Sequence, residues 1–314
     1  MDQCQNNTIR GFHIMGFTMS GTESFPKFIV FFLMYLISVI GNMLIALLVC
    51  KVPRLHTPMY FFLSNLSIVD ATYVSAILPK LLSITLMEHK AISFEGCFTQ
   101  LYFFVFCADA EICILICMAY DRYVAVCSPL HYSMMMRKSV CAIMSGCSFV
   151  VSALNSLLLT LLTSTLSFCS SHNINHFFCE IRSLIILSTS DTTSAEMVLF
   201  VEDICFIFST FVLIMISYVC IIHNVFKIRS SEGRLKTFSS CTSHLISVIL
   251  FYGPIIFLYI KPKPKDSMEE NPLVSLLYVA VVPTLNPFVY TLRNKKVIGV
   301  IVKIIKIKSS SLVS

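Results

Sequence analysis

The chain has 314 residues, of which 56% are hydrophobic and only 13% are charged. Soluble domains carry about 25% charged residues, so this composition excludes an ordinary water-soluble globule. The net charge of +6 could suit a nucleic-acid-binding protein, but the basic residues lie between apolar blocks rather than together on one soluble face. We therefore expect a membrane protein with no nucleic-acid partner.

Seven apolar stretches are long enough to cross a bilayer, which takes about 20 residues. In chain order they are 28–50, 55–86, 96–120, 139–168, 204–226, 237–260 and 271–292. The connectors between them are short, which leaves room for one bundle and no separate soluble domain. The sequence therefore predicts an all-α membrane protein, a seven-transmembrane helix bundle over residues 26–292.

The basic residues predict how this bundle is oriented. If the N-terminus is outside, 15 of the 23 Lys and Arg residues fall on the cytoplasmic side, where basic residues concentrate. Residues 1–25 are then extracellular, and Asn6 in the sequon Asn6-Asn7-Thr8 becomes a glycosylation site. Residues 293–314 are then cytoplasmic. Ile and Val alternate with Lys over 297–307, which predicts a short amphipathic eighth helix on the membrane lipids, with a frayed tail as the alternative.

Five short motifs fall in order along the predicted spans. They are LHTPMYFFLSNLS at 55–67, MAYDRYVAVC at 118–127, SY at 217–218, KTFSSCTSHL at 236–245 and PTLNPFVY at 283–290. In composition and spacing they resemble the signatures of odorant receptors, a family of rhodopsin-like G protein-coupled receptors. The resemblance implies that a small odorant binds in the outer half of the bundle and that a stimulatory heterotrimeric G protein is activated at the plasma membrane, which raises cyclic AMP.

Asp121 and Arg122, near the end of the third span, have two interpretations. An ion pair at a helix end can be a simple interface anchor. The resemblance implies instead a switch, in which Asp121 holds Arg122 at rest and Arg122 meets the G protein when the sixth helix moves. The residues that it assigns to this switch are Asp121, Arg122, Tyr123, Tyr218, Lys236, Thr237, His244, Asn286, Pro287 and Tyr290.

Asp70 and Glu111 are ionisable residues in the middle of predicted spans, where charges are costly and commonly functional. The resemblance places both of them in one polar pocket with Asn42 and Asn286. Carboxylate and amide oxygens are hard ligands that suit a small cation such as sodium. A protonated, water-linked cluster without an ion is the alternative.

The resemblance also pairs Cys97 with Cys179 as a disulfide, which an oxidising exterior permits. The family's second loop pair would join Cys169 to position 189, where this chain has Thr189, so we do not expect that bridge. Cys4 could reach Cys169, although the sequence supplies no geometry for such a pair. The segment from His176 to Glu180 could hold a soft metal ion, but its cysteine is expected in the disulfide.

Three acids, Asp109, Glu202 and Asp203, stand where the family usually has neutral side chains. Successive helical residues are about 100° apart, so Asp109 points nearly opposite to Glu111. Because the resemblance turns Glu111 toward Asp70, it implies that Asp109 faces the ligand cavity. An unpartnered carboxylate is costly in such a cavity, and no Lys or Arg lies at that depth in the neighbouring spans, which predicts a cationic amine as the ligand. The expected ligand-binding residues are Val105, Ala108, Asp109, Ile112, Glu202, Asp203, Cys205, Phe206, Phe251, Tyr252 and Tyr259.

A second interpretation of these acids needs no charged ligand. Glu202 and Asp203 could reach outer water or the three lysines Lys261, Lys263 and Lys265, and Asp109 could be protonated.

Other classes of protein fit less well. The sequence has no Gly-rich phosphate loop and no His-Glu-x-x-His or Gly-x-Ser-x-Gly motif, so we do not expect an enzyme. A secondary transporter should show inverted repeats and broken helices, and neither is visible. A non-olfactory receptor for a small amine is the nearer alternative. Such receptors usually carry a Trp in the sixth helix, where this chain has Phe251-Tyr252-Gly253.

Overall fold

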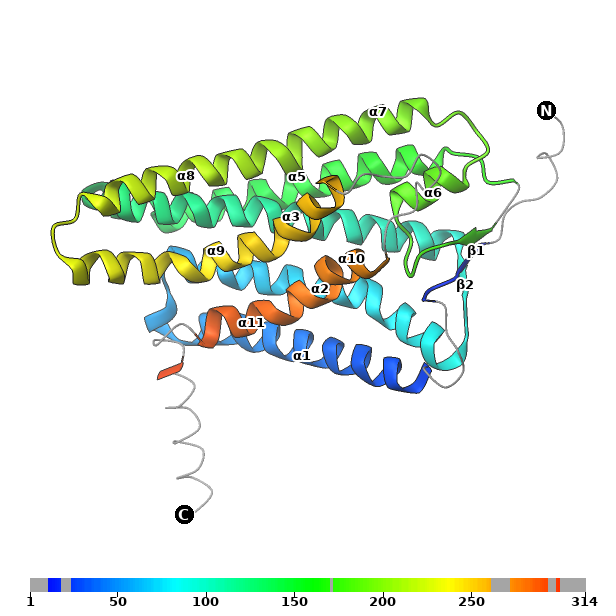
Figure 1. Ribbon diagram of the computed structural model, residues 1–314, viewed down its shortest axis with the longest axis horizontal. Helices are drawn as coiled ribbons and strands as arrows, with labels where there is room; N and C mark the ends of the chain where they lie inside the picture. The colour runs from blue at the N-terminus through cyan, green and yellow to red at the C-terminus, as the bar shows by residue number, and fades with distance from the viewer. Residues whose placement is uncertain (1–10, 18–23, 170–171, 261–271, 293–297, 300–314) are drawn as a thin grey trace, which may run out of the picture.

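The computed structural model describes residues 11–17, 24–169, 172–260, 272–292 and 298–299, apart from the side chains of residue 240, residues 258–260 and residue 292. Long helices lie side by side in one bundle, and a small sheet lies at one end, which we call the sheet end (Figure 1). Several predicted features lie outside the described residues: Cys4, Asn6, the lysines at 261, 263 and 265, and most of the expected amphipathic helix at 297–307.

Six helical spans among the described residues are long and apolar enough to cross a membrane. They are α1 (Ser24–Lys51), α2 (Pro58–Met87), α3 (Phe94–Cys127), α5 (Lys138–Ser164), the run of α7 (Thr193–Glu202), η3 (Asp203–Phe208) and α8 (Ser209–Phe226), and the run of α10 (Pro272–Leu276), η4 (Leu277–Val281) and α11 (Val282–Leu292). A seventh span, within α9 (Ser231–Ile260), bends by 42° between residues 231–239 and 241–257. The predicted helical membrane bundle is confirmed.

The helices extend beyond the apolar stretches that predicted them. The fifth span begins at Thr193 rather than near residue 204, because Glu196, Glu202 and Asp203 interrupt the apolar pattern without interrupting the helix.

At the start of α3, the Ser93 side chain accepts a hydrogen bond from the Gly96 amide at 3.0 Å, which caps the helix.

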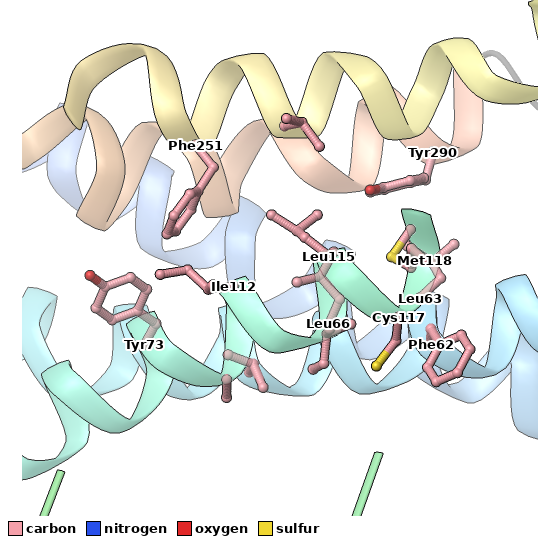
Figure 2. Packing of buried hydrophobic residues seen from close by; sticks show 14 of the residues in the cluster. Phe62, Leu63, Leu66, Tyr73, Ile112, Leu115, Cys117, Met118, Phe251 and Tyr290 are labelled. Carbon is pink, nitrogen blue, oxygen red and sulfur yellow. The ribbon is translucent and has the colours of Figure 1, made fainter. Parts of the chain in front are cut away.

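The centre of the bundle is formed by α2 and α3, the two most buried spans. Phe62 and Leu66 of α2 pack with Leu115 and Met118 of α3, and Tyr290 of α11 closes this core from the other side (Figure 2). Lipid tails are as apolar as these side chains, so close packing rather than exclusion of water holds membrane helices together. Gly41 illustrates this closeness, since a Cβ there would lie 3.0 Å from Pro287.

The outward faces of α1, α5 and α8 remain apolar. Exposed side chains on them include Ile40, Leu154 and Val219. An apolar outer surface of this extent suits contact with lipid rather than with water.

The short connections carry the remaining elements. They are η1 (Pro53–Leu55), β2 (Ala91–Ser93), η2 (Pro129–His131), α4 (Tyr132–Met135), β3 (Asn173–Ile174) and α6 (Ile181–Leu187), with β1 (Gly11–Ile14) ahead of the first span. In the sheet, β1 lies in the middle, antiparallel to β2 and parallel to β3. A glycine is required at position 11, because a Cβ there would meet the Ile92 carbonyl oxygen at 2.2 Å.

A disulfide fixes the loop between α5 and α6 to the sheet end of α3. It joins Cys97 to Cys179, as predicted. Next to it, the Gln100 side chain accepts a hydrogen bond from the Cys179 amide and donates one to the Ala76 carbonyl, both at 2.9 Å. Phe177 and Phe178 are consequently buried inside the bundle. Cys169, in the same loop, is also disulfide-bonded.

Candidate functional site

A cavity of about 160 Å³ lies between the helices near the sheet end. Its volume is comparable to the roughly 150 Å³ apolar cavity known to admit benzene, so it suits a small molecule. Most of the wall is apolar or aromatic, which is typical of small-molecule sites. The lining side chains of this kind include Tyr73, Phe104, Val105, Ala108, Ile112, Phe251 and Tyr278. Phe104 also contacts Phe178 of the loop, at 4.8 Å between ring centroids.

Charged side chains make up the rest of the wall. Four carboxyl groups and one guanidinium line the described part of the cavity, from Asp109, Glu180, Glu202, Asp203 and Arg182. Arg182 donates to the Asp203 carboxylate at 2.7 Å, so this pair neutralises itself. Nε2 of His176 lies 3.4 Å from the Glu180 carboxylate. The carboxyl groups therefore outnumber the guanidinium. Two of them have a partner: Asp203 pairs with Arg182, and Glu180 lies beside His176.

The remaining two acids, Asp109 and Glu202, share one neutral neighbour. Asn155 of α5 donates to the Asp109 carboxylate at 2.9 Å, and it also interacts with Glu202. Asp109 is only 3% exposed, and the two carboxyl groups are close enough for their charges to interact. Among the described residues, neither acid forms an ion pair with a basic side chain. We call Asp109 and Glu202 the carboxyl pair.

Not every residue expected at the ligand site lies there. Val105, Ala108, Asp109, Ile112, Glu202, Asp203 and Phe251 line the cavity. Cys205 and Phe206 of η3 do not, and Cys205 is exposed. Tyr252 is buried outside the lining, where its hydroxyl lies 2.8 Å from that of Thr210. The side chain of Tyr259 lies outside the described residues.

Arg182 and Asn155 were not predicted at this site. The sequence-based prediction considered basic residues in the neighbouring spans, whereas Arg182, the partner of Asp203, comes from the loop helix α6. Loop residues follow no helical periodicity of the bundle, so no sequence signal pointed to Arg182. Asn155 of α5 contacts Asp109 of α3. A contact between two helices cannot be predicted from the sequence pattern of either helix alone.

A buried polar cluster lies deeper in the bundle. Asn286 of α11 donates to Asp70 at 2.8 Å, and Glu111 interacts with both of them. Asn42 of α1 donates to the Pro283 carbonyl at 2.9 Å. One oxygen each of Asn42, Asp70 and Glu111 is buried with no hydrogen-bond partner among the described residues. Carboxylate and amide oxygens of this kind are ligands that a small cation prefers.

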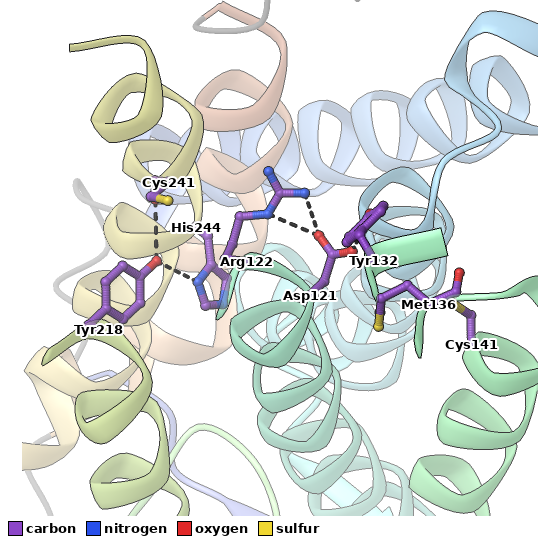
Figure 3. A network of polar contacts seen from close by, with 8 residues as sticks. All are labelled: Asp121, Arg122, Tyr132, Met136, Cys141, Tyr218, Cys241 and His244. Atoms are coloured by element: carbon purple, nitrogen blue, oxygen red, sulfur yellow. Dashed lines mark hydrogen bonds and ion pairs between the residues drawn. The ribbon is translucent and has the colours of Figure 1, made fainter. Parts of the chain in front are cut away.

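The end of the bundle opposite to the sheet holds the Asp121–Arg122 ion pair (Figure 3). Nε of Arg122 donates to Asp121 at 3.0 Å, and the Tyr132 hydroxyl donates to the other carboxylate oxygen at 2.7 Å. Burial and the neighbouring Asp121 carboxylate raise the pKa of Tyr132, so its hydroxyl keeps the proton that it donates. Asp121 thereby accepts hydrogen bonds from two side chains, and Tyr132 was not among the residues predicted for this network.

A second contact at this end ties three helices together. The Tyr218 hydroxyl of α8 lies 2.7 Å from Nδ1 of His244 on α9 (Figure 3). Nε2 of His244 lies 3.0 Å from the Leu115 carbonyl of α3. Pro287 and Tyr290 are buried nearby in α11, Tyr123 and Thr237 are half-buried, and Lys236 is exposed. Most of the residues expected in the switch thus lie at or near the ends of α3, α8, α9 and α11 opposite to the sheet, whereas Asn286 lies in the buried polar cluster.

Comparison with known proteins agrees with this architecture. Residues 31–308 match the family model described as olfactory receptor. The chain is 47% identical over 307 residues to olfactory receptor 5AR1 of Mus musculus, covering 97% of this chain and 98% of that protein. It is 46% identical over 312 residues to the Homo sapiens protein of the same name, covering 98% and 100%. Olfactory receptor 1L4 of Homo sapiens is 43% identical over 290 residues, covering 92% and 93%. The chain therefore belongs to the olfactory receptor family, multi-pass membrane G protein-coupled receptors that are not enzymes.

Proposed function

We propose that this receptor detects a small cationic amine in the cavity near the sheet end and activates a stimulatory heterotrimeric G protein at the opposite end, which raises cyclic AMP. The observation that carries the ligand class is the carboxyl pair. Its two acids face a small, mostly apolar cavity and share an amide neighbour. Among the described residues neither is in an ion pair, although the charge of Arg182 also acts on Glu202.

The energetics favour an ammonium group there. A carboxylate in a low-dielectric site is costly unless a cation or several hydrogen bonds compensate it. Arg182 already pairs with Asp203, so it is not free to compensate Asp109. An ammonium group brings one positive charge and several donors, while its hydrocarbon part can contact Val105, Ile112 and Phe251. A neutral odorant of the same shape would leave the acids without a counter-charge.

Two helices connect the cavity to the switch. Asp109 and Asp121 both lie on α3, about 18 Å apart along the axis at 1.5 Å per residue. On α9, Phe251 lines the cavity and His244, two helical turns away on the same face, bonds to Tyr218. A ligand that contacts α3 and α9 can therefore favour a packing in which α9 moves and Arg122 is released. The ligand can shift the equilibrium toward this packing only by the difference between its binding free energies for the two packings.

The buried polar cluster is proposed to hold a sodium ion. Asp70 and Glu111 would supply carboxylate oxygens and Asn42 an amide oxygen, and the ion would neutralise charge in the apolar interior. The three buried oxygens without partners support this assignment.

The sheet end is proposed to be extracellular, with residues 1–25 outside and residues 293–314 in the cytoplasm of a plasma-membrane receptor. The disulfide between Cys97 and Cys179 supports this orientation independently of the basic residues, because disulfides persist in oxidising compartments.

A ligand panel tests the proposed ligand class. Primary amines should activate cyclic-AMP signalling at concentrations at which alcohols of the same carbon skeleton do not. Asp109→Asn and Glu202→Gln should each raise the amine concentration for half-maximal response by about 30-fold, since truncating a buried charge pair costs at least about 2 kcal/mol. The matched control is Glu196→Gln, an exposed acid of α7 outside the cavity lining. Equal potency of alcohols, or an unchanged amine response in Asp109→Asn, contradicts the proposal.

The switch is tested separately from the ligand site. Arg122→Ala should abolish ligand-stimulated cyclic AMP while surface expression and ligand binding stay close to those of the parent receptor. Arg54→Ala, which changes an exposed arginine of η1 at the same end, serves as the control. A normal cyclic-AMP response of Arg122→Ala at equal surface expression would remove Arg122 from the mechanism.

The sodium site is tested by thermal stability rather than by signalling. Sodium chloride should raise the Tm of the purified receptor above that in choline chloride at equal ionic strength, because an ion that binds the folded state stabilises it. Asp70→Asn should remove the difference between the two salts. Equal Tm values in both salts for the parent receptor would indicate a polar cluster without an ion.

Glycosylation tests the orientation. An extracellular N-terminus exposes the sequon at Asn6 to the glycosylation machinery. The receptor made in mammalian cells should shift on a gel after glycosidase treatment, and Asn6→Gln should abolish the shift. A persisting shift in that variant would mean that another site is modified.

A further inference from the structure

The ligand cavity has a second polar end besides the carboxyl pair. Its lining includes two tyrosines, Tyr73 of α2 and Tyr278 of η4, together with Glu180 of the loop. Tyr73 is only 1% exposed, and among the described residues its hydroxyl makes no hydrogen bond. A buried polar atom without a partner is uncommon in proteins and calls for an explanation. We call Tyr73, Tyr278 and Glu180 the tyrosine end of the cavity.

The polar side chains of the two ends form separate sets. Tyr73 is close enough to Tyr278 and Glu180 for their charges to act on it. Glu202 has a different set of neighbours of this kind, which includes Asp109. Among the described residues, no side chain belongs to both sets. The cavity therefore offers polar contacts at two places rather than at one.

An apolar face of α3 separates the two ends. Phe104, Ala108 and Ile112 line the cavity and are spaced four residues apart, which places them along one face of the helix. On one side of this face, Phe104 contacts Tyr73 with 5.8 Å between ring centroids. Asp109 is five residues further on, which corresponds to about 140° round the helix and about 7.5 Å along its axis. A small molecule with a polar group at each end and carbon between them matches this arrangement.

We propose that the ligand is an amino alcohol, which binds the carboxyl pair with its ammonium group and the hydroxyl of Tyr73 with its own hydroxyl. The carbon chain between the two groups contacts the apolar face of α3. This proposal rests on the proposed function, because it keeps the ammonium group at the carboxyl pair and adds a second point of recognition.

The chemistry of the tyrosine end favours a neutral group over a second ammonium. The phenol hydroxyl of Tyr73 can both donate and accept a hydrogen bond, as a ligand hydroxyl can. Glu180 already has a neighbour, since its carboxylate lies 3.4 Å from Nε2 of His176, which is also 3.2 Å from the Ser275 hydroxyl. A second ammonium would lose its hydration at an end whose carboxyl group is already engaged, and that loss is costly. A hydroxyl loses less and supplies a partner for Tyr73.

Pairs of ligands test the proposal in a cyclic-AMP assay. In a series of increasing chain length, each amino alcohol is compared with the alkylamine in which a methyl group replaces the hydroxyl. At one chain length the amino alcohol should be the more potent of the two. Tyr73→Phe should lower the ratio of the two potencies by about fivefold, which corresponds to about 1 kcal/mol for one hydrogen bond. The potency of the alkylamine should stay unchanged in this variant.

The ratio makes the test independent of expression, because both ligands are measured on the same receptor. The matched control is Tyr35→Phe, which changes a half-buried tyrosine of α1 outside the cavity lining and should leave the ratio as it is. If Tyr73→Phe does not reach the surface, the ligand series on the parent receptor still decides.

Failure of this proposal is distinguishable from failure of the proposed function. If no amine activates the receptor, or if Asp109→Asn leaves the responses to both ligands unchanged, the proposed function is wrong and the amino-alcohol proposal is wrong with it. If alkylamines activate as expected but the hydroxyl adds no potency at any chain length, or if its gain persists in Tyr73→Phe, only the contact with Tyr73 is overturned. Diamines that are more potent than amino alcohols of the same length would overturn the choice of a hydroxyl.

Discussion

The structure depends on one constraint: a polar group inside an apolar bundle must find its partner within the protein. An unsatisfied polar group in hydrocarbon costs several kcal/mol, so the few buried polar residues decide which helices are held together. The hydrogen bond from Asn286 to Asp70 connects α11 to α2. His244 of α9 contacts the Leu115 carbonyl of α3 and the Tyr218 hydroxyl of α8. The apolar side chains around them fill space, whereas these contacts specify one packing of the helices.

The carboxyl pair in the cavity departs from this pattern. Asp121 is held by Arg122 and Tyr132, and Asp203 by Arg182, but Asp109 and Glu202 share a neutral amide. Because neither acid is in an ion pair among the described residues, an ammonium ligand would supply favourable charge that a neutral ligand lacks. Helix α3 lines the cavity near one end and carries Asp121 near the other. A ligand bound in the cavity would therefore contact a helix that also belongs to the proposed switch.

The sequence predicted the seven spans, the disulfide between Cys97 and Cys179, and the side of α3 that faces the cavity, because each follows from local pattern or a family motif. It failed where position depends on contacts between distant segments. Arg182 reaches Asp203 from a loop helix, and Tyr132 reaches Asp121 from the connection between α3 and α5. Cys205 and Phe206 do not line the cavity, whereas Asp203 and Ile207 of the same segment η3 do.

The most direct test of the central claim is an experimental structure of the receptor with an activating amine bound. We expect the ligand in the cavity, with its ammonium nitrogen at about 2.7–3.2 Å from carboxylate oxygens of Asp109 and Glu202 and its hydrocarbon part against Ile112 and Phe251. A ligand bound outside this cavity, or one bound with its ammonium group away from both acids, would contradict the account.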